Sequence, residues 1–158
     1  MARGLLVLCS FSVFAATSAY GALGDNVITS SGFSKVSSSK ATTSMAKTTS
    51  GVNYTVSETT DAAGIKIRQY SDASGLIFAI SWKGPVVPDL QLLFGNYTTE
   101  YRATLEKRPK MRGSRYLKVD TGKIVVEGGG RQWDQKGRAY ITKSLPSGFN
   151  LEDINSND

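Results

Sequence analysis

The chain has 158 residues, one cysteine and no histidine, and its formal net charge is +6 at neutral pH. This length fits a single domain with a substantial core. Without histidine the chain lacks the most common general base and metal ligand, so an ordinary catalytic triad and a histidine-based metal site are excluded. We expect no cofactor, and the basic balance favours an anionic partner.

Residues 1–21 have the pattern of a secretory signal peptide. A basic start is followed by an apolar run from Leu5 to Ala16, which is shorter than the roughly 20 residues that span a bilayer. Small residues predict cleavage between Gly21 and Ala22, and cleavage after Ala19 is the alternative. The sequence therefore predicts a periplasmic or secreted protein without a transmembrane anchor. Because the only cysteine lies in this run, the mature chain would hold no disulfide.

Serine and threonine dominate residues 29–50, and large apolar side chains are sparse there. Such a segment buries too little apolar surface to offset the entropy cost of ordering it. We therefore predict that residues 22–51 form a flexible lead-in, and that residues 52–154 form one folded domain.

Three strands are predicted at the start of this domain. Alternation of side-chain character favours strands over residues 54–58 and 65–70. The more continuously apolar run from Leu76 to Trp82 predicts the central strand, with Trp82 in the core. Short turns that end in glycine separate the three, as is typical of an antiparallel meander.

One amphipathic helix is predicted next. Asp89 is a favourable N-cap, and apolar residues then recur at steps of three and four up to Leu105. Gly95 in the middle weakens this helix by about 1 kcal/mol relative to alanine. Proline follows at position 109, so we expect the helix to end there.

The rest of the domain carries further strand signals, over residues 115–120, 123–127 and 137–142. The three glycines at 128–130 are interpreted as a bulge or wide turn that breaks the strand before them. The predicted fold is α+β, with one amphipathic helix packed across an antiparallel sheet of five or six strands.

Several segments of this domain match a recurring pattern. They are Ile67-Arg68-Gln69-Tyr70, Ile77 to Pro85, Pro88-Asp89-Leu90, Leu92 to Gly95, Val125-Val126, Gly128-Gly129, Gly137 to Tyr140 and Leu145 to Gly148. With Ala22-Leu23-Gly24 at the start of the mature chain, the sequence resembles a family of exported proteobacterial proteins catalogued as a domain of unknown function (DUF2844). The serine- and threonine-rich lead-in and the polar segment Arg131 to Lys136 depart from the pattern. The resemblance implies export and domain limits but no activity.

Positive charge is concentrated in the second half of the chain. Between Tyr101 and Lys143 there are twelve lysines and arginines against four acids. This excess suggests a face that binds an anionic envelope component, such as a lipid phosphate or lipopolysaccharide, and no nucleic acid is expected in an exported protein. The alternative is a solvated basic surface without a site. The candidate binding residues are Arg112, Arg115, Arg131, Trp133, Lys136 and Arg138, with Trp133 as an exposed aromatic contact or, alternatively, a core or edge plug.

Two other classes of function remain open at this stage. A small hydrolase would need two carboxylates about 5 to 9 Å apart, and Asp120, Glu127 and Asp134 are the candidates. A structural partner of another exported protein would instead show an exposed apolar patch or an unpaired sheet edge.

Overall fold

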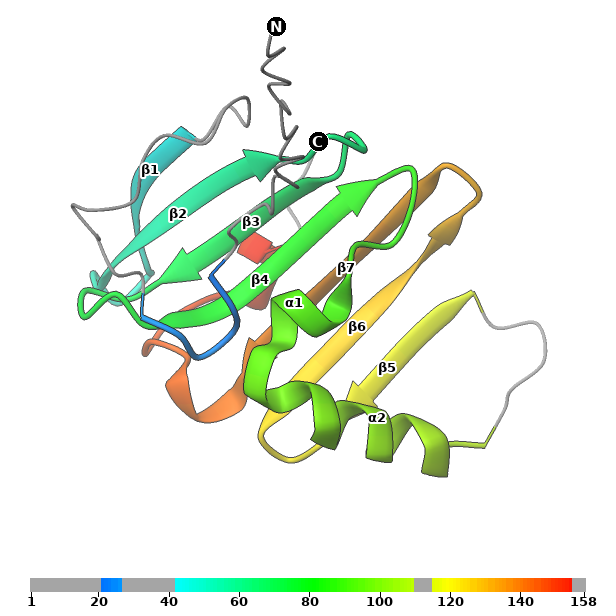
Figure 1. Ribbon diagram of the computed structural model, residues 1–158. Helices are drawn as coiled ribbons and strands as arrows, with labels where there is room; N and C mark the ends of the chain where they lie inside the picture. Colours follow the sequence, from blue (N-terminus) through cyan, green and yellow to red (C-terminus); the bar gives the residue numbers. More distant parts are fainter. Residues whose placement is uncertain (1–20, 27–41, 110–114, 155–158) are drawn as a thin grey trace, which may run out of the picture.

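The computed structural model describes residues 21–26, 42–109 and 115–154 (Figure 1). Its centre is a seven-stranded antiparallel sheet with the order β1-β2-β3-β4-β7-β6-β5. The strands are β1 (Thr42–Lys47), β2 (Asn53–Thr60), β3 (Lys66–Ser71), β4 (Ile77–Gly84), β5 (Tyr116–Asp120), β6 (Ile124–Arg131) and β7 (Asp134–Ile141). The predicted α+β class and antiparallel sheet are confirmed, while the strand count exceeds the expected five or six.

Part of the predicted lead-in belongs to the fold. Residues 42–47 form β1, which pairs along its whole length with β2 although its side chains are mostly exposed. Leu23 is 2% exposed, and its N–H donates to the Leu93 carbonyl oxygen at 2.8 Å. The prediction from composition missed β1 and the buried Leu23 because it considered only how much apolar side-chain surface the segment could bury. The order of β1 comes instead from its backbone hydrogen bonds with β2. Residues 1–20 and 27–41, with most of the predicted signal peptide, lie outside the described residues.

The predicted helix is present but interrupted. It consists of α1 (Leu90–Phe94), a 3-10 turn η1 (Gly95–Tyr97) and α2 (Thr98–Lys107). The Asp89 side chain accepts a hydrogen bond from the Gln91 N–H, which confirms the N-cap. The break falls at Gly95, which has a φ of 49° and lies so close to Ala22 that a Cβ would come within 2.8 Å of the alanine methyl. Glycine at this position therefore allows the N-terminal segment to pack close to the helix, where any side chain would clash with Ala22.

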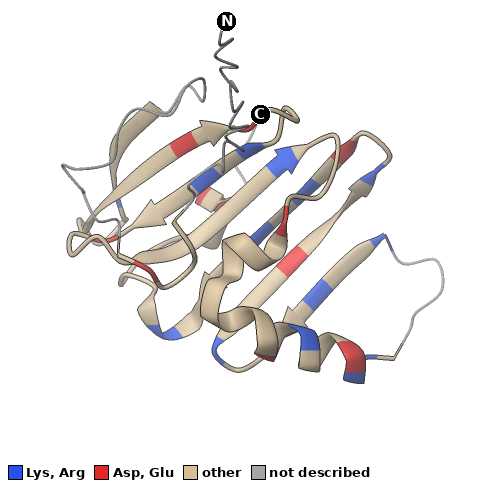
Figure 2. Cartoon of the chain, in the orientation of Figure 1, with Lys and Arg blue, Asp and Glu red and all other residues tan. Residues whose placement is uncertain are grey.

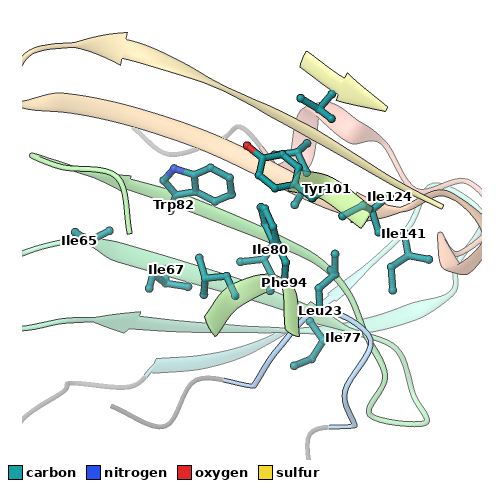
Figure 3. Close-up of a cluster of buried hydrophobic side chains, with 14 residues drawn as sticks. Leu23, Ile65, Ile67, Ile77, Ile80, Trp82, Phe94, Tyr101, Ile124 and Ile141 are labelled. Carbon is teal, nitrogen blue, oxygen red and sulfur yellow. The ribbon is translucent and has the colours of Figure 1, made fainter. Parts of the chain in front are cut away.

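The sheet is covered on both faces. On the face that we call the helical face, α1, α2 and Leu23 pack over a cluster that includes Ile80, Trp82 and Phe94 (Figures 1 and 3). On the opposite face, the tail face, the C-terminal segment 142–154 packs over Tyr70 and Phe78. The first six residues of β4 are buried, as expected for a strand covered on both sides.

The three glycines at 128–130 do not break the strand, so this prediction is wrong. β6 runs through them and pairs each one with β7. Gly128 lies directly opposite Gly137, and the Trp82 indole ring packs against both. Gly128 and Gly137 leave room for this large ring on the helical face, which the sequence alone does not reveal.

The fit of the Trp82 ring predicts different tolerances at the two opposed glycines. A Cβ at Gly137 would overlap the ring, so Gly137→Ala is expected to destabilise the fold by about 1–3 kcal/mol. A Cβ at Gly128 would make only ordinary contacts, the nearest at 3.6 Å, so Gly128→Ala is the matched control. Urea unfolding measures both variants. Equal stability of the two would contradict the placement of Trp82.

Candidate functional site

Three lysines on adjacent strands face one another directly. Lys66 on β3 is the register partner of Lys83 on β4, and Lys83 is the partner of Lys136 on β7. Because Trp82 faces the helices, its neighbour Lys83 faces the tail side, and its two partners share that face. Figure 2 shows basic positions on these three strands. We call Lys66, Lys83 and Lys136 the lysine row. Like charges placed directly opposite one another destabilise a sheet.

A second polar row lies on the same face, two residues along each of these strands. It contains, in register, Glu58, Arg68, Ser81, Arg138, Glu127 and Lys118 on β2, β3, β4, β7, β6 and β5. The arginines here are paired with acids: Arg68 Nε lies 2.5 Å from Glu58, and Arg138 Nε lies 2.7 Å from Glu127. The second row is therefore largely neutralised within the fold.

Glu127 is the electrostatic centre of the second row. Its side chain is 7% exposed and accepts from Arg138 and from Lys118, whose Nζ lies 2.9 Å away. Burial alone would raise the pKa of this carboxyl. The hydrogen bonds and charges of Lys118 and Arg138 outweigh burial, so the pKa is lowered from its ordinary value. Glu127 is consequently ionised, and it fixes the position of Arg138.

A cavity of about 450 Å³ is lined by residues of both rows and by neighbouring residues of β5 and β6. We call it the basic cavity. Among the described residues, its lining includes Lys83, Arg115, Lys136 and Arg138 as cations, Glu127 as the only carboxylate, and Gly128, Gly129, Gly130 and Gly137. The space that a Cβ would take at Gly129, Gly130 and Gly137 is filled by the protein itself, namely by the Arg115 carbonyl, the Asp134 carbonyl and the Trp82 ring. The arrangement suits a small anionic group.

The structure brings together three of the six predicted binding residues. Arg115, Lys136 and Arg138 line the basic cavity. The guanidinium of Arg138 is only partly available, because it also donates to the Leu151 carbonyl at 2.6 Å. Arg112 lies outside the described residues. Lys83 was not predicted, because the charge count began at Tyr101 and strand register is invisible in composition.

The other two candidates, Arg131 and Trp133, lie apart from the basic cavity at the β6–β7 hairpin. Arg131 pairs with Asp134, so Trp133 occupies the second position of a two-residue connection, with a φ of 68°. Its side chain is 71% exposed, which contradicts the alternative of a core or edge plug. Trp133 lines a separate, shallower hollow beside Pro85.

The carboxylates considered for a hydrolase do not form a catalytic pair. Asp134 is opposite Arg131, four positions along β6 from Glu127, a separation of about 13 Å at 3.3 Å per residue. Asp120 is the diagonal neighbour of Glu127, but its side chain accepts from the Gly122 N–H at 2.8 Å. Glu127, held ionised by two cations, is unsuited to act as a general acid.

The third hypothesis, a structural partner, expects an open edge. Within the described ranges β1 and β5 each pair on one side only, so both edges of the sheet are open. An open antiparallel sheet always has two such edges, so this feature does not distinguish the hypotheses. None of the described helices is long and apolar enough to cross a bilayer.

The match to a protein family covers most of the chain. A family described as "Protein of unknown function (DUF2844)" matches residues 19–154. The chain belongs to the DUF2844 family. The DUF2844 match begins upstream of residue 52, in agreement with the burial of Leu23 and the pairing of β1 with β2. No curated protein and no solved structure matches the chain.

Proposed function

We propose that this DUF2844 protein is exported and binds the phosphate of an anionic envelope component in the basic cavity. The observation that carries the proposal is the lysine row, in which Lys83 faces a lysine on either side. Among the described residues, neither Lys66 nor Lys136 forms an ion pair. A bound anion would relieve this repulsion, whereas a merely soluble surface gains nothing from like charges in direct opposition.

Preorganisation is the second support. Arg138 is held by Glu127 and by the Leu151 carbonyl, and its side chain is 16% exposed. A cation fixed in this way loses little side-chain entropy when it binds an anion. This fixed cation distinguishes the basic cavity from scattered surface lysines.

Export is the part of the proposal that rests on residues 1–21. Their short apolar run behind a basic start is the pattern of a cleaved signal. An exported protein meets phosphate groups chiefly on lipids and lipopolysaccharide, so the proposed compartment and the charge of the cavity agree.

The experiment compares two pairs of lysines. The full chain is expressed in a bacterium, and the product is recovered from the periplasm. Its mass is expected to match that of a chain that begins at Ala22. Binding to phosphatidylglycerol vesicles is then measured at physiological salt. Each lysine near an anionic surface contributes about 1 kcal/mol, so Lys83→Gln with Lys136→Gln should weaken binding by about thirtyfold.

The matched control is Lys107→Gln with Lys143→Gln, which removes the same charge from exposed positions outside the cavity. We expect this control to bind within about threefold of the parent protein. If both double variants lose affinity equally, the charge acts non-specifically and the basic cavity is not the site. Arg138 is left unchanged in this experiment because it also holds Glu127.

A further inference from the structure

A second cavity, of about 480 Å³, lies on the helical face between α2 and the β5–β6 end of the sheet. We call it the apolar cavity. Its walls include Trp82, Leu90, Tyr101, Leu105, Leu117 and Val126. Figure 3 shows Trp82, Phe94 and Tyr101 grouped between the sheet and the helices. The volume falls within the range of about 300–1,000 Å³ that is typical of small-molecule sites.

Several apolar side chains of this cavity are incompletely covered. Leu105 on α2 is 36% exposed and Val87 is 50% exposed, while Leu117 is half-buried. Leaving such surface in water costs about 25 cal/mol per Å². The walls are therefore suited to an apolar group.

The apolar and basic cavities share part of their lining. Trp82, Arg115, Tyr116, Gly128, Gly129 and Lys136 contribute to both. The two cavities nevertheless lie on opposite faces of the sheet, because Trp82 faces the helices whereas the Lys136 side chain shares the tail face with Lys83. A ligand in the apolar cavity can contact Trp82 with its apolar part and Arg108 and Arg115 with its charged part.

Charge decides the kind of ligand. Among the described residues that line the apolar cavity, the charged ones are Arg108, Arg115 and, from the opposite face of the sheet, Lys136, and none is a carboxylate. A cationic amphiphile would be repelled, and a neutral one would leave the cations without a partner. We propose that the apolar cavity holds the acyl or alkyl chain of a single-chain anionic amphiphile, with its headgroup at Arg108 and Arg115. This site lies outside the basic cavity, so the inference goes beyond the proposed function.

The test uses octyl phosphate and decyl phosphate below their micellar concentrations. Trp133→Phe leaves Trp82 as the only tryptophan, because the chain has two, so its emission reports on the cavity. Each buried methylene contributes about 0.8 kcal/mol, which predicts about fifteenfold tighter binding of decyl than of octyl phosphate. The emission of Trp82 should shift to shorter wavelength as the chain excludes water.

Making the wall of the apolar cavity polar should weaken the dependence of affinity on the length of the alkyl chain. Leu105→Gln is expected to reduce the decyl-to-octyl affinity ratio at least threefold. Leu92→Gln is the matched control, since Leu92 lies on α1, is 58% exposed and does not line the cavity. Octyl and decyl phosphates that bind equally well, or a ratio equally insensitive to Leu105→Gln and Leu92→Gln, would overturn the inference. The vesicle experiment with the lysine variants judges the proposed function separately.

Discussion

Replacing Phe94 by alanine is expected to destabilise the fold by about 3–5 kcal/mol, the usual cost of removing a buried aromatic side chain. Phe94 is fully buried, and its ring centroid lies 5.0 Å from that of Tyr101 and 6.3 Å from that of Trp82. A helix of five residues such as α1 has little stability of its own. The packing of Phe94 therefore holds the helical layer on the sheet.

Leu92→Ala is the control for this prediction, because it changes the same short helix at a side chain that is 58% exposed. Its effect should stay within about 0.5 kcal/mol. Urea unfolding followed by circular dichroism measures both variants. A Phe94→Ala protein as stable as Leu92→Ala would show that the helical layer is not anchored by this ring.

Glu127→Ala is expected to cost about 3 kcal/mol, because it leaves the partly buried guanidinium of Arg138 without its counter-charge. Replacing Glu127 and Arg138 together by leucine should recover much of this loss, since no buried charge is then left alone. Lys118→Ala removes the other cation, whose side chain is 55% exposed, and should change stability little. If the double variant is less stable than Glu127→Ala, this account of the pair is wrong.

The same carboxylate gives stability a defined pH dependence. The folded-state pKa of Glu127 lies below the ordinary value of 4.5, so the unfolded chain takes up a proton at higher pH than the folded one does. The stabilisation is thus complete above about pH 5 and is lost as the pH falls through the folded-state pKa. Unfolding free energies measured between neutral and acid pH should show a smaller decrease in the double leucine variant than in the parent.

Features that depend on nearest neighbours in the sequence could be predicted. The strands before and after Gly75, the helix that starts after Asp89 and the burial of Trp82 all follow from periodicity and from turn or cap residues. β1 could not be predicted, because its order comes from pairing with β2 and its composition resembles that of a linker. The strand through Gly128 could not be predicted either, because its glycines accommodate a ring from β4.

The candidate site was predicted in part for the same reason. Arg115, Lys136 and Arg138 were found because a local excess of charge is visible in the sequence. Lys66 and Lys83 were missed because only the register of β3, β4 and β7 places them beside Lys136. The neutralisation of Arg138 was missed too, since its partner Glu127 was considered only as a catalytic acid.

The order of the strands has a consequence for the speed of folding. β1 to β4 are each joined to the next neighbour in the sheet by a short connection, and the same is true of β5 to β7. Only the pairing of β4 with β7 joins these two halves, and it closes a loop that contains both helices, β5 and β6. Local hairpins form at small entropic cost, whereas closing a long loop costs more before any contact is gained. The pairing of β4 with β7, in which Trp82 meets Gly137, is therefore the step that we expect to set the folding rate.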